Sequence, residues 1–156
     1  MFKVFFMLET LFTFGWKGNF NKLRRKALNP KRVIARFLYE LYVKKHQSYI
    51  PLSCTINGDL QFVHFTGIHI SSYAIVGTGC TLYQHVTIGS NHLKMTKHPG
   101  DPQIGDNVLI GAGARIIGGI KIGNNVKIGA RCVVTEDVPD NSVVVMNKPR
   151  IIIKSE

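Results

Sequence analysis

A six-residue repeat of aliphatic side chains constrains this chain more than any other feature of its sequence. From residue 76 to residue 138, an isoleucine, valine or leucine returns every six positions, usually with a glycine behind it. The repeated positions are Val76, Leu82, Ile88, Ile104, Ile110, Ile116, Ile122, Ile128 and Val134. Small or aliphatic residues follow four positions later, at Cys80, Val86, Val108, Ala114, Ile120, Val126, Cys132 and Val138. A period of six suits neither an amphipathic helix nor an alternating strand, and it is typical of a β-solenoid built from hexapeptides.

Such a repeat predicts coils with three flat faces, each coil made from three hexapeptides. The first and fifth residues of each hexapeptide point inward and stack on neighbouring coils, which lie about 4.8 Å apart. Glycines and the pair Asn124-Asn125 fall at the corners, where a positive φ is often needed. Extended toward the N-terminus, the repeat puts Leu52, His64 and Ile70 in first positions, and it puts Ile56, Phe62, Ile68 and Ala74 in fifth positions. The solenoid is therefore expected to begin near residue 51.

The repeat is interrupted once between residues 76 and 138. Sixteen residues separate Ile88 from Ile104, which is not a multiple of six, and the intervening segment 90–103 is rich in polar residues, proline and glycine. This segment predicts a loop expelled from the solenoid wall. Insertions of this kind commonly gather on the working face of a solenoid, so the loop is a candidate part of a functional site.

Charge is distributed unevenly along the 156 residues. Residues 1–50 hold eleven Lys and Arg against two Glu, so they account for +9 of the formal net charge of +11. This contrast divides the chain into a basic helical segment (1–50), the solenoid (51–150, with the loop at 90–103) and a tail (151–156). At this length the chain is one compact domain with a small appendage.

Two helices are expected in the basic segment. The first spans about Phe2–Phe14 and is rich in large apolar residues, and the second begins with Asn29 as its N-cap and Pro30 at its first position. The second helix is expected to gather its apolar residues on one face: Val33, Ile34, Phe37, Leu38 and Leu41. Two interpretations stay open. The helices pack on the solenoid or on each other, or they anchor at an anionic membrane surface beside the basic cluster 22–26.

Other partner classes are less well supported by the sequence. No nucleic-acid-binding motif accompanies the positive charge. Glu9 interrupts the apolar run without a cleavage site after it, and the run is too short to span a membrane, so we expect neither a signal peptide nor a spanning helix. Three cysteines, Cys54, Cys80 and Cys132, show no metal-binding spacing and predict reduced core thiols in a cytoplasmic protein.

Residues 50–150 resemble the hexapeptide-repeat acyltransferases, and in particular the serine O-acetyltransferase branch. The resemblance is carried by His64-Phe65-Thr66-Gly67-Ile68, by residues 75–89 (IVGTGCTLYQHVTIG) and by residues 104–138, which contain the run Gly111–Ala114. It covers about two thirds of the chain. It implies a left-handed parallel β-helix, hence a mainly β protein with a short N-terminal helical segment. It also implies a homotrimer with acetyl-CoA bound between adjacent subunits.

The resemblance places the catalytic histidine at His64. A neutral imidazole can take the proton of a hydroxyl as that hydroxyl attacks a thioester carbonyl, which fits a general base. Three positions depart from the serine enzymes. Val63 stands where an aspartate usually precedes the histidine, Tyr49 replaces a carboxylate that would orient it, and Asp101 occupies the place of a second active-site histidine. The pattern is closer to the short acetyltransferases of surface-polysaccharide gene clusters.

Further residues are candidates for binding the two substrates. For the acceptor, the candidates are His85, His92, His98 and Asp101. For acetyl-CoA, the resemblance implies Gly113, Ala114 and Ala130 along the coils, Gly89 or Ser90 as an oxyanion donor, and Lys148 and Arg150 near the CoA phosphates.

Four functions therefore remain in view. The favoured one is acetyl-CoA-dependent O-acetylation of a sugar hydroxyl of a capsule, exopolysaccharide or lipopolysaccharide, by a protein in the cytoplasm or peripheral at the inner membrane face. The alternative is serine O-acetylation for cysteine biosynthesis. A zinc carbonic-anhydrase-like protein would use histidines such as His64, His69 and His85, but no metal is expected in this context. A non-catalytic scaffold is the last.

Overall fold

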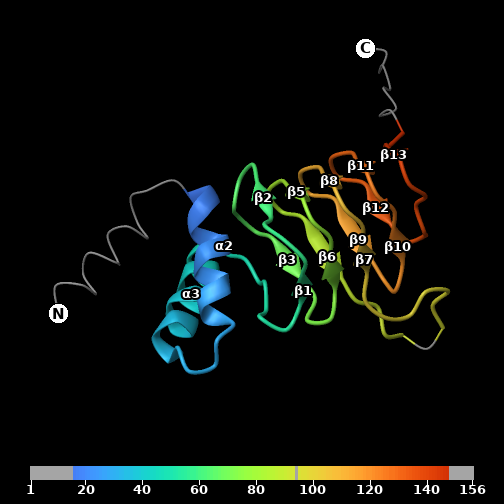
Figure 1. Ribbon diagram of the computed structural model, residues 1–156. Coiled ribbons are helices and arrows are strands. Elements are labelled where there is room, and N and C mark those ends of the chain that lie inside the picture. Colours follow the sequence, from blue (N-terminus) through green and yellow to red (C-terminus); the bar gives the residue numbers. More distant parts are fainter. Residues whose placement is uncertain (1–15, 94, 148–156) are drawn as a thin grey trace, which may run out of the picture.

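The computed structural model describes residues 16–93 and 95–147. They form a left-handed β-helix with three parallel sheets and two helices at one end, which confirms the predicted fold class (Figure 1). The expected helix at Phe2–Phe14, the tail 151–156, and Lys148 and Arg150 lie outside the described residues. None of the described helices is long and apolar enough to cross a membrane.

Each coil contributes one short strand to each sheet. Sheet 1 holds β1 (Thr55–Ile56), β4 (Ile75–Val76), β7 (Gln103–Ile104) and β10 (Lys121–Ile122). Sheet 2 holds β2 (Gln61–Phe62), β5 (Thr81–Leu82), β8 (Leu109–Ile110), β11 (Lys127–Ile128) and β13 (Val143–Val144). Sheet 3 holds β3 (His69–Ile70), β6 (Thr87–Gly89), β9 (Arg115–Ile117) and β12 (Val133–Val134). An isolated parallel bridge between Tyr49 and His69 extends sheet 3 by one residue pair.

The aliphatic residues of the repeat build the core. Each strand is paired in parallel with the strand one coil away, so that, for example, Leu82 stacks on Ile110. Nearly all the inward residues of the repeat are less than a tenth exposed. Their burial in contiguous columns supplies the hydrophobic stabilisation of the solenoid.

The sequence-based alignment of the first coil was wrong by two residues. Phe62 pairs with Leu82, and Ile70 pairs with Ile88. Eight residues therefore separate Phe62 from Ile70, where six separate Leu82 from Ile88. Ile56 and Phe62 consequently take first positions, not fifth. The two extra residues also mean that His64 lies outside the repeat, on the surface, and not in an inward position.

The three cysteines are free and buried, which confirms the prediction of core thiols. Cys80 and Cys132 fill fifth positions as expected, and the corrected alignment gives Cys54 the same role. Burial raises the pKa of the Cys54 and Cys80 thiols, so both stay protonated and unreactive near neutral pH.

The two described helices differ from the expected ones in position. α2 covers Trp16–Ala27, a stretch that the sequence did not indicate, and α3 covers Val33–Lys45. α3 begins three residues after Pro30 and has Arg32 at its N-cap position, so Asn29 does not cap it. The Asn29 carboxamide oxygen instead accepts a hydrogen bond from the Lys31 N–H at 3.0 Å within the turn that joins the helices.

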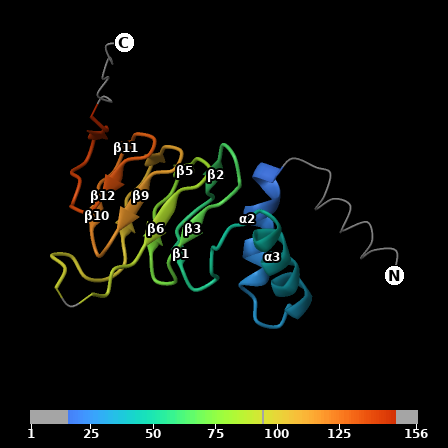
Figure 2. The ribbon, with the colours of Figure 1, turned by 180° about the vertical axis from the view of Figure 1, so that it is seen from behind.

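The helices cover the first coil of the solenoid (Figures 1 and 2). Phe20 of α2 is fully buried among the rings of Tyr39, Phe62 and Phe65, with centroid distances of 5.0–5.7 Å. The Asn21 side chain pairs with both backbone groups of residue 60, donating at 2.9 Å and accepting at 3.2 Å. The first interpretation, in which the helices pack on the solenoid, therefore holds for α2 and α3, and this packing satisfies polar groups at the end of the solenoid.

The buried face of α3 is not the expected one. Its buried residues are Leu38, Tyr39, Tyr42 and Val43. Of the five residues predicted to share the core face, only Leu38 is buried. The Tyr39 hydroxyl donates to the Ile50 carbonyl at 2.6 Å, which lets the ring enter the core. Burial raises the pKa of Tyr42 to about 12.

Segment 90–103 leaves the wall of the solenoid and returns beside the next coil. Asn91 and Gly100 exchange backbone hydrogen bonds at 2.9 and 2.7 Å at the neck of the loop. The Gly119 N–H donates to the His98 carbonyl at 3.0 Å. A side chain at Gly118 would come within 2.6 Å of that carbonyl oxygen, and Gly118 has a φ of +99°, so both features require glycine there.

Candidate active site

The prism has three edges, which we name by the sheets that they join. The first edge joins sheets 1 and 2, the second joins sheets 2 and 3, and the third joins sheets 3 and 1. On the first two edges the chain makes the same turn, whose second residue has a positive φ of 56–71°. On the first edge these residues are Gly79, Asn107, Asn125 and Asn141, and on the second edge they are Gly67, His85, Gly113 and Arg131. From the second coil of each column onward, the N–H of this residue donates to a carbonyl of the preceding coil, as in Asn107, Asn125 and Asn141 on the first edge and His85, Gly113 and Arg131 on the second.

The first edge also binds its remaining backbone donors with side chains. The N–H groups of Thr78, Asp106 and Asn124 donate to the side-chain oxygens of Asp106, Asn124 and Asp140 at 2.7–2.8 Å. Glycines before these turns leave room for the ladder, since a side chain at Gly105 would lie 2.7 Å from Asn124 Oδ1. These backbone N–H groups of the first edge therefore all have acceptors within the chain.

The second edge carries no such ladder. The residues equivalent to Thr78, Asp106 and Asn124 are Gln84, Ala112 and Ala130. Within residues 16–93 and 95–147, no acceptor receives the backbone N–H of these three residues. The Gln84 Oε1 atom is buried and also lacks a partner there. Unpaired backbone donors beside small side chains make this edge a ready surface for an elongated polar ligand.

His64 lies at the start of this open edge. Phe65 is buried against Phe62, Tyr42 and the His46 ring, and this anchor fixes the chain so that the preceding His64 side chain is exposed. On the next coil, His85 stacks beside Gly67, and its N–H donates to the Thr66 carbonyl at 2.9 Å. In the described residues no side chain hydrogen-bonds His64.

The three coil residues predicted to bind acetyl-CoA lie on the same edge. Gly113 and Ala130 form part of two successive turns there, and Ala130 is exposed. Ala114 has its methyl group fully buried in the core, so only its backbone could face a ligand. His64, His85, Gly113 and Ala130 thus lie along one edge, although they are spread over more than sixty residues of sequence.

The other predicted residues gather at the third edge. Asp101 accepts a hydrogen bond from Ser71 Oγ at 2.7 Å, and its second oxygen lies 3.6 Å from His92 Nε2. The Asp101 side chain is only 14% exposed, whereas the His92 ring is 66% exposed. His98 lies farther along the loop, and Gly89 and Ser90 lead into it. Asp101 is therefore held by Ser71 and lies beside the exposed His92 ring.

Sheet 3 separates these two groups of residues. From Gly67 at the second edge to Ser71 at the third, four extended residues span about 13 Å. The outward residues of sheet 3 between the edges include His69, Thr87 and Arg115. A single copy therefore does not bring His64 together with Asp101 and His92.

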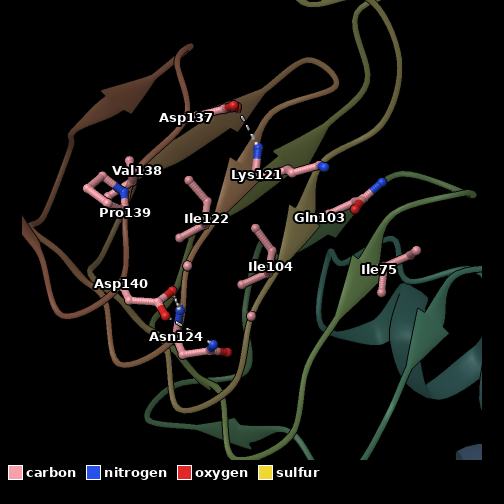
Figure 3. A pocket seen from close by; sticks show the side chains of 12 residues that line it. Ile75, Gln103, Ile104, Lys121, Ile122, Asn124, Asp137, Val138, Pro139 and Asp140 are labelled. Atoms are coloured by element: carbon pink, nitrogen blue, oxygen red, sulfur yellow. Dashed lines mark hydrogen bonds between the residues drawn. The ribbon is translucent and has the colours of Figure 1, made fainter.

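A hollow of about 560 Å³ lies elsewhere, on sheet 1 near the C-terminal coils (Figure 3). It is lined by outward side chains of β4, β7 and β10 and by residues 137–140. Asp137 and Asp140 already accept backbone N–H groups there at 2.8 and 2.7 Å. The hollow holds none of the predicted site residues, so it is a groove of the wall and not the candidate site.

The described part of one copy has no group of three His, Cys, Asp or Glu side chains placed to hold a metal ion. His64 and His85 share the second edge, but His69 points from sheet 3, where its Nδ1 lies 3.2 Å from the Gly67 carbonyl oxygen. A zinc site of the carbonic-anhydrase type would therefore need ligands from two copies.

Three residues of the site region escaped the sequence analysis. Gln84 lay within the quoted stretch 75–89 but carried no role there, and its buried Oε1 atom shows only in the structure. Ser71 carried no motif, and only the stacking of coils shows that it faces Asp101. Phe65 lay within the quoted motif, but its role as an anchor depends on the helices. A sequence signal existed only for Phe65, as a large aromatic residue inside the irregular spacing between Phe62 and Ile70.

Comparison with known proteins now adds to this geometry. The family described as "Bacterial transferase hexapeptide (six repeats)" matches residues 101–136. The solenoid is a hexapeptide-repeat domain similar to that of serine acetyltransferases. A serine acetyltransferase of Synechococcus elongatus is 44% identical over 92 residues, which are 59% of this chain and 37% of that protein. One from Staphylococcus aureus is 46% identical over 82 residues, covering 53% of this chain and 38% of that protein.

Solved structures show the same similarity. Serine acetyltransferase isoform 3 of Entamoeba histolytica, in complex with cysteine, matches with a TM-score of 0.75 at 30% identity over 94% of this chain and 53% of that one. The Neisseria gonorrhoeae enzyme in complex with serine gives 0.66 at 33% identity, covering 83% of this chain and 53% of that one. The chain thus spans well under half the length of these curated relatives and about half of each solved chain.

These comparisons bear unequally on the two acceptor hypotheses. They support the serine acetyltransferase alternative better than the favoured polysaccharide reading, and they lend no support to the polysaccharide branch of the resemblance.

Proposed function

We propose that this protein is an acetyl-CoA-dependent O-acetyltransferase with His64 as general base, and that its acceptor is L-serine. The observation that carries the proposal is the second edge, where His64 stands at the head of a column of open backbone N–H groups and small residues. Acetyl-CoA has an elongated chain with amide groups, which this column could hold in extended form. The similarity to serine acetyltransferases supports the serine acceptor.

In the proposed reaction, the His64 imidazole takes the proton of the acceptor hydroxyl as the oxygen attacks the thioester carbonyl carbon. The tetrahedral intermediate carries its negative charge on the former carbonyl oxygen, which a backbone N–H such as that of Gly89 or Ser90 would stabilise. Collapse of the intermediate breaks the C–S bond. The imidazolium returns its proton to the leaving CoA sulfur, which gives the acetyl ester and free CoA.

The acceptor half of the site is proposed to come from a neighbouring copy in a homotrimer. His64 and the loop residues lie on opposite edges of sheet 3 in one copy, so a cleft between two copies would bring them together. There, His92 and Asp101, with His98 and His85, would bind the acceptor. Lys148 and Arg150 would meet the CoA phosphates.

A sugar hydroxyl remains the second candidate acceptor. The observation that favours it is the lack of a carboxylate near His64, where Val63 and Tyr49 replace the acidic residues of the serine enzymes. The Ser71–Asp101–His92 arrangement would also bind a sugar hydroxyl as readily as an amino acid.

The test is CoA release from acetyl-CoA, followed with a thiol reagent, with L-serine or with a panel of sugars. We expect serine-dependent release that is lost in His64→Ala, while Asp101→Asn raises the KM for the acceptor more than it lowers kcat. CoA binding without serine-dependent release, but with release driven by a sugar, would move the acceptor to a glycan. A protein that neither binds CoA nor releases it would contradict the acetyltransferase proposal and favour a scaffold.

A further inference from the structure

Helix α3 carries a second apolar face that nothing in the described structure covers. Val33, Ile34, Phe37 and Leu41 are exposed to 71%, 65%, 65% and 45%. We call these four residues the α3 stripe. In a helix, each residue turns by about 100°, so the four fall within an arc of about 100° on one side. The residues that pack on the solenoid occupy a separate arc, so the stripe is not the edge of the core.

Basic residues lie at both ends of the stripe. Lys31 and Arg32 lie at its N-terminal end and Lys44 at its C-terminal end, and all three are exposed. Further exposed basic residues of the two helices are Lys22, Arg25, Lys26 and Arg36, of which Arg25 pairs with Asp59 at 3.3 Å. Between residues 16 and 50 the sequence contains one acidic residue, Glu40. Exposed apolar side chains together with a net positive charge on the same two helices suit an occupant that is both apolar and negatively charged.

Two occupants within the protein itself fail this requirement. A second copy that met this one stripe to stripe would oppose one basic helical pair to another, and like charges facing each other weaken association. Residues 1–15 are rich in phenylalanine and leucine, but they carry one Lys and one Glu and so bring no surplus of negative charge. Neither would neutralise the cations around the stripe.

We propose that the α2–α3 unit docks on an anionic lipid surface through the α3 stripe. A bilayer with anionic headgroups offers acyl chains to the four apolar side chains and negative charge to the lysines and arginines beside them. The basic side chains can reach upward to the headgroups while their methylene stems lie on the apolar layer. This inference does not depend on the proposed enzymatic function.

The helices sit at the end of the solenoid opposite the last coils, with sheets 1–3 extending away from them (Figures 1 and 2). Binding through the stripe would therefore lay α3 in the plane of the interface and leave the second edge and the loop facing water. α3 has thirteen residues, which suits this interfacial position and not a crossing of the bilayer.

The test is flotation of the full chain with lipid vesicles. We expect the protein to float with vesicles of phosphatidylcholine containing about one third phosphatidylserine and to remain below with phosphatidylcholine alone, with binding weakened in about 0.5 M salt. Ile34→Asp combined with Phe37→Asp should weaken binding at least about tenfold, because both substitutions place charge in the apolar layer.

A matched control separates the loss of apolar contact from the decrease in net charge. Asn57→Asp combined with Gln61→Glu lowers the net charge by the same two units at exposed positions of the first coil and should bind as the parent does. Circular dichroism and gel filtration of each variant check folding and assembly. Failure of the parent to float with anionic vesicles would overturn the proposal, as would undiminished flotation of the stripe variant. A changed oligomeric state in the stripe variant would instead assign the stripe to contacts between copies.

Discussion

The first and second edges of the solenoid are made by the same turn, yet they treat their backbone N–H groups differently. On the first edge, Asp106, Asn124 and Asp140 reach back to the N–H groups of the coil before them. On the second edge, Gln84, Ala112 and Ala130 leave the equivalent donors without an acceptor in the described residues. The second edge also carries His64 and His85, and the first edge has no histidine in the described residues.

The contrast between the two edges indicates that the first contributes mainly to stability and the second mainly to ligand binding. A side-chain ladder strengthens a corner but occupies the groups that a ligand would use. A corner of alanine and glycine gives up those hydrogen bonds and keeps its backbone available. Variants of the two edges should therefore fail in opposite ways, one in folding and the other in binding and catalysis.

The largest effect is expected from His64→Ala. Loss of the general base should lower kcat for CoA release by about 10²–10⁴-fold. The thermal unfolding midpoint should hardly change, because the side chain is exposed and has no hydrogen-bond partner in the described residues. Steady-state kinetics and circular dichroism on the same preparation check both halves. Activity close to that of the parent would exclude His64 as the base.

The next largest effect is expected from Ala130→Glu on the second edge. The carboxylate would stand beside the open N–H column and repel the phosphates of CoA, raising the KM for acetyl-CoA by about tenfold or more. Because Ala130 is exposed, folding should tolerate the change. Lys127→Glu, at an exposed position on sheet 2, introduces the same side chain away from the column. Equal effects of the two variants on the KM for acetyl-CoA would show that the second edge is not the acetyl-CoA-binding surface.

On the first edge, Asn124→Ala should act on stability. The variant deletes the acceptor of the Asp106 N–H, so the free energy of unfolding should fall by about 1–2 kcal/mol. Urea unfolding measures this change, and kcat/KM below the unfolding transition should stay at the parental value. A loss of activity without a loss of stability would mean that the first edge also contributes to the site.

The smallest effect concerns pH and the helix–solenoid junction. Burial, with the nearby Lys45 charge, lowers the pKa of His46 below its ordinary value of 6.5. The folded state therefore binds this proton less readily than the unfolded chain does. The stability is complete above about pH 6.5 and declines as the pH falls toward the lower folded-state pKa. His46→Gln should lessen the difference in urea midpoint between pH 8 and pH 5.5, and an unchanged difference would show that other groups cause it.

The sequence could predict the solenoid because its core positions repeat, but it could not detect the shift in the first coil. First and fifth positions both point inward and lie two residues apart in neighbouring hexapeptides. An insertion of two residues therefore moves Ile56 and Phe62 from one inward position to the other. The hydrophobic pattern stays intact, and only pairing with Val76 and Leu82 reveals the change.

The sequence also misjudged α3, and the reason is physical. Phe37 and Ile34 are more hydrophobic than Tyr39 and Tyr42, so hydrophobicity alone selects the wrong face. The tyrosines are buried because Phe20 and Phe65 receive their rings and the Ile50 carbonyl accepts the Tyr39 hydroxyl. In the same way, the partnership of Asp101 with Ser71 and His92 depends on the path of the loop, which no local pattern indicates.

The most direct test of the difference between the edges is residue-specific amide hydrogen exchange by NMR, with and without CoA. Our account predicts that CoA slows exchange and shifts the resonances at Gln84, Ala112 and Ala130, while Thr78, Asp106 and Asn124 stay as they were. Bound CoA that protects the first edge, or that leaves the second edge unchanged, would contradict the assignment of the second edge as the substrate-binding edge.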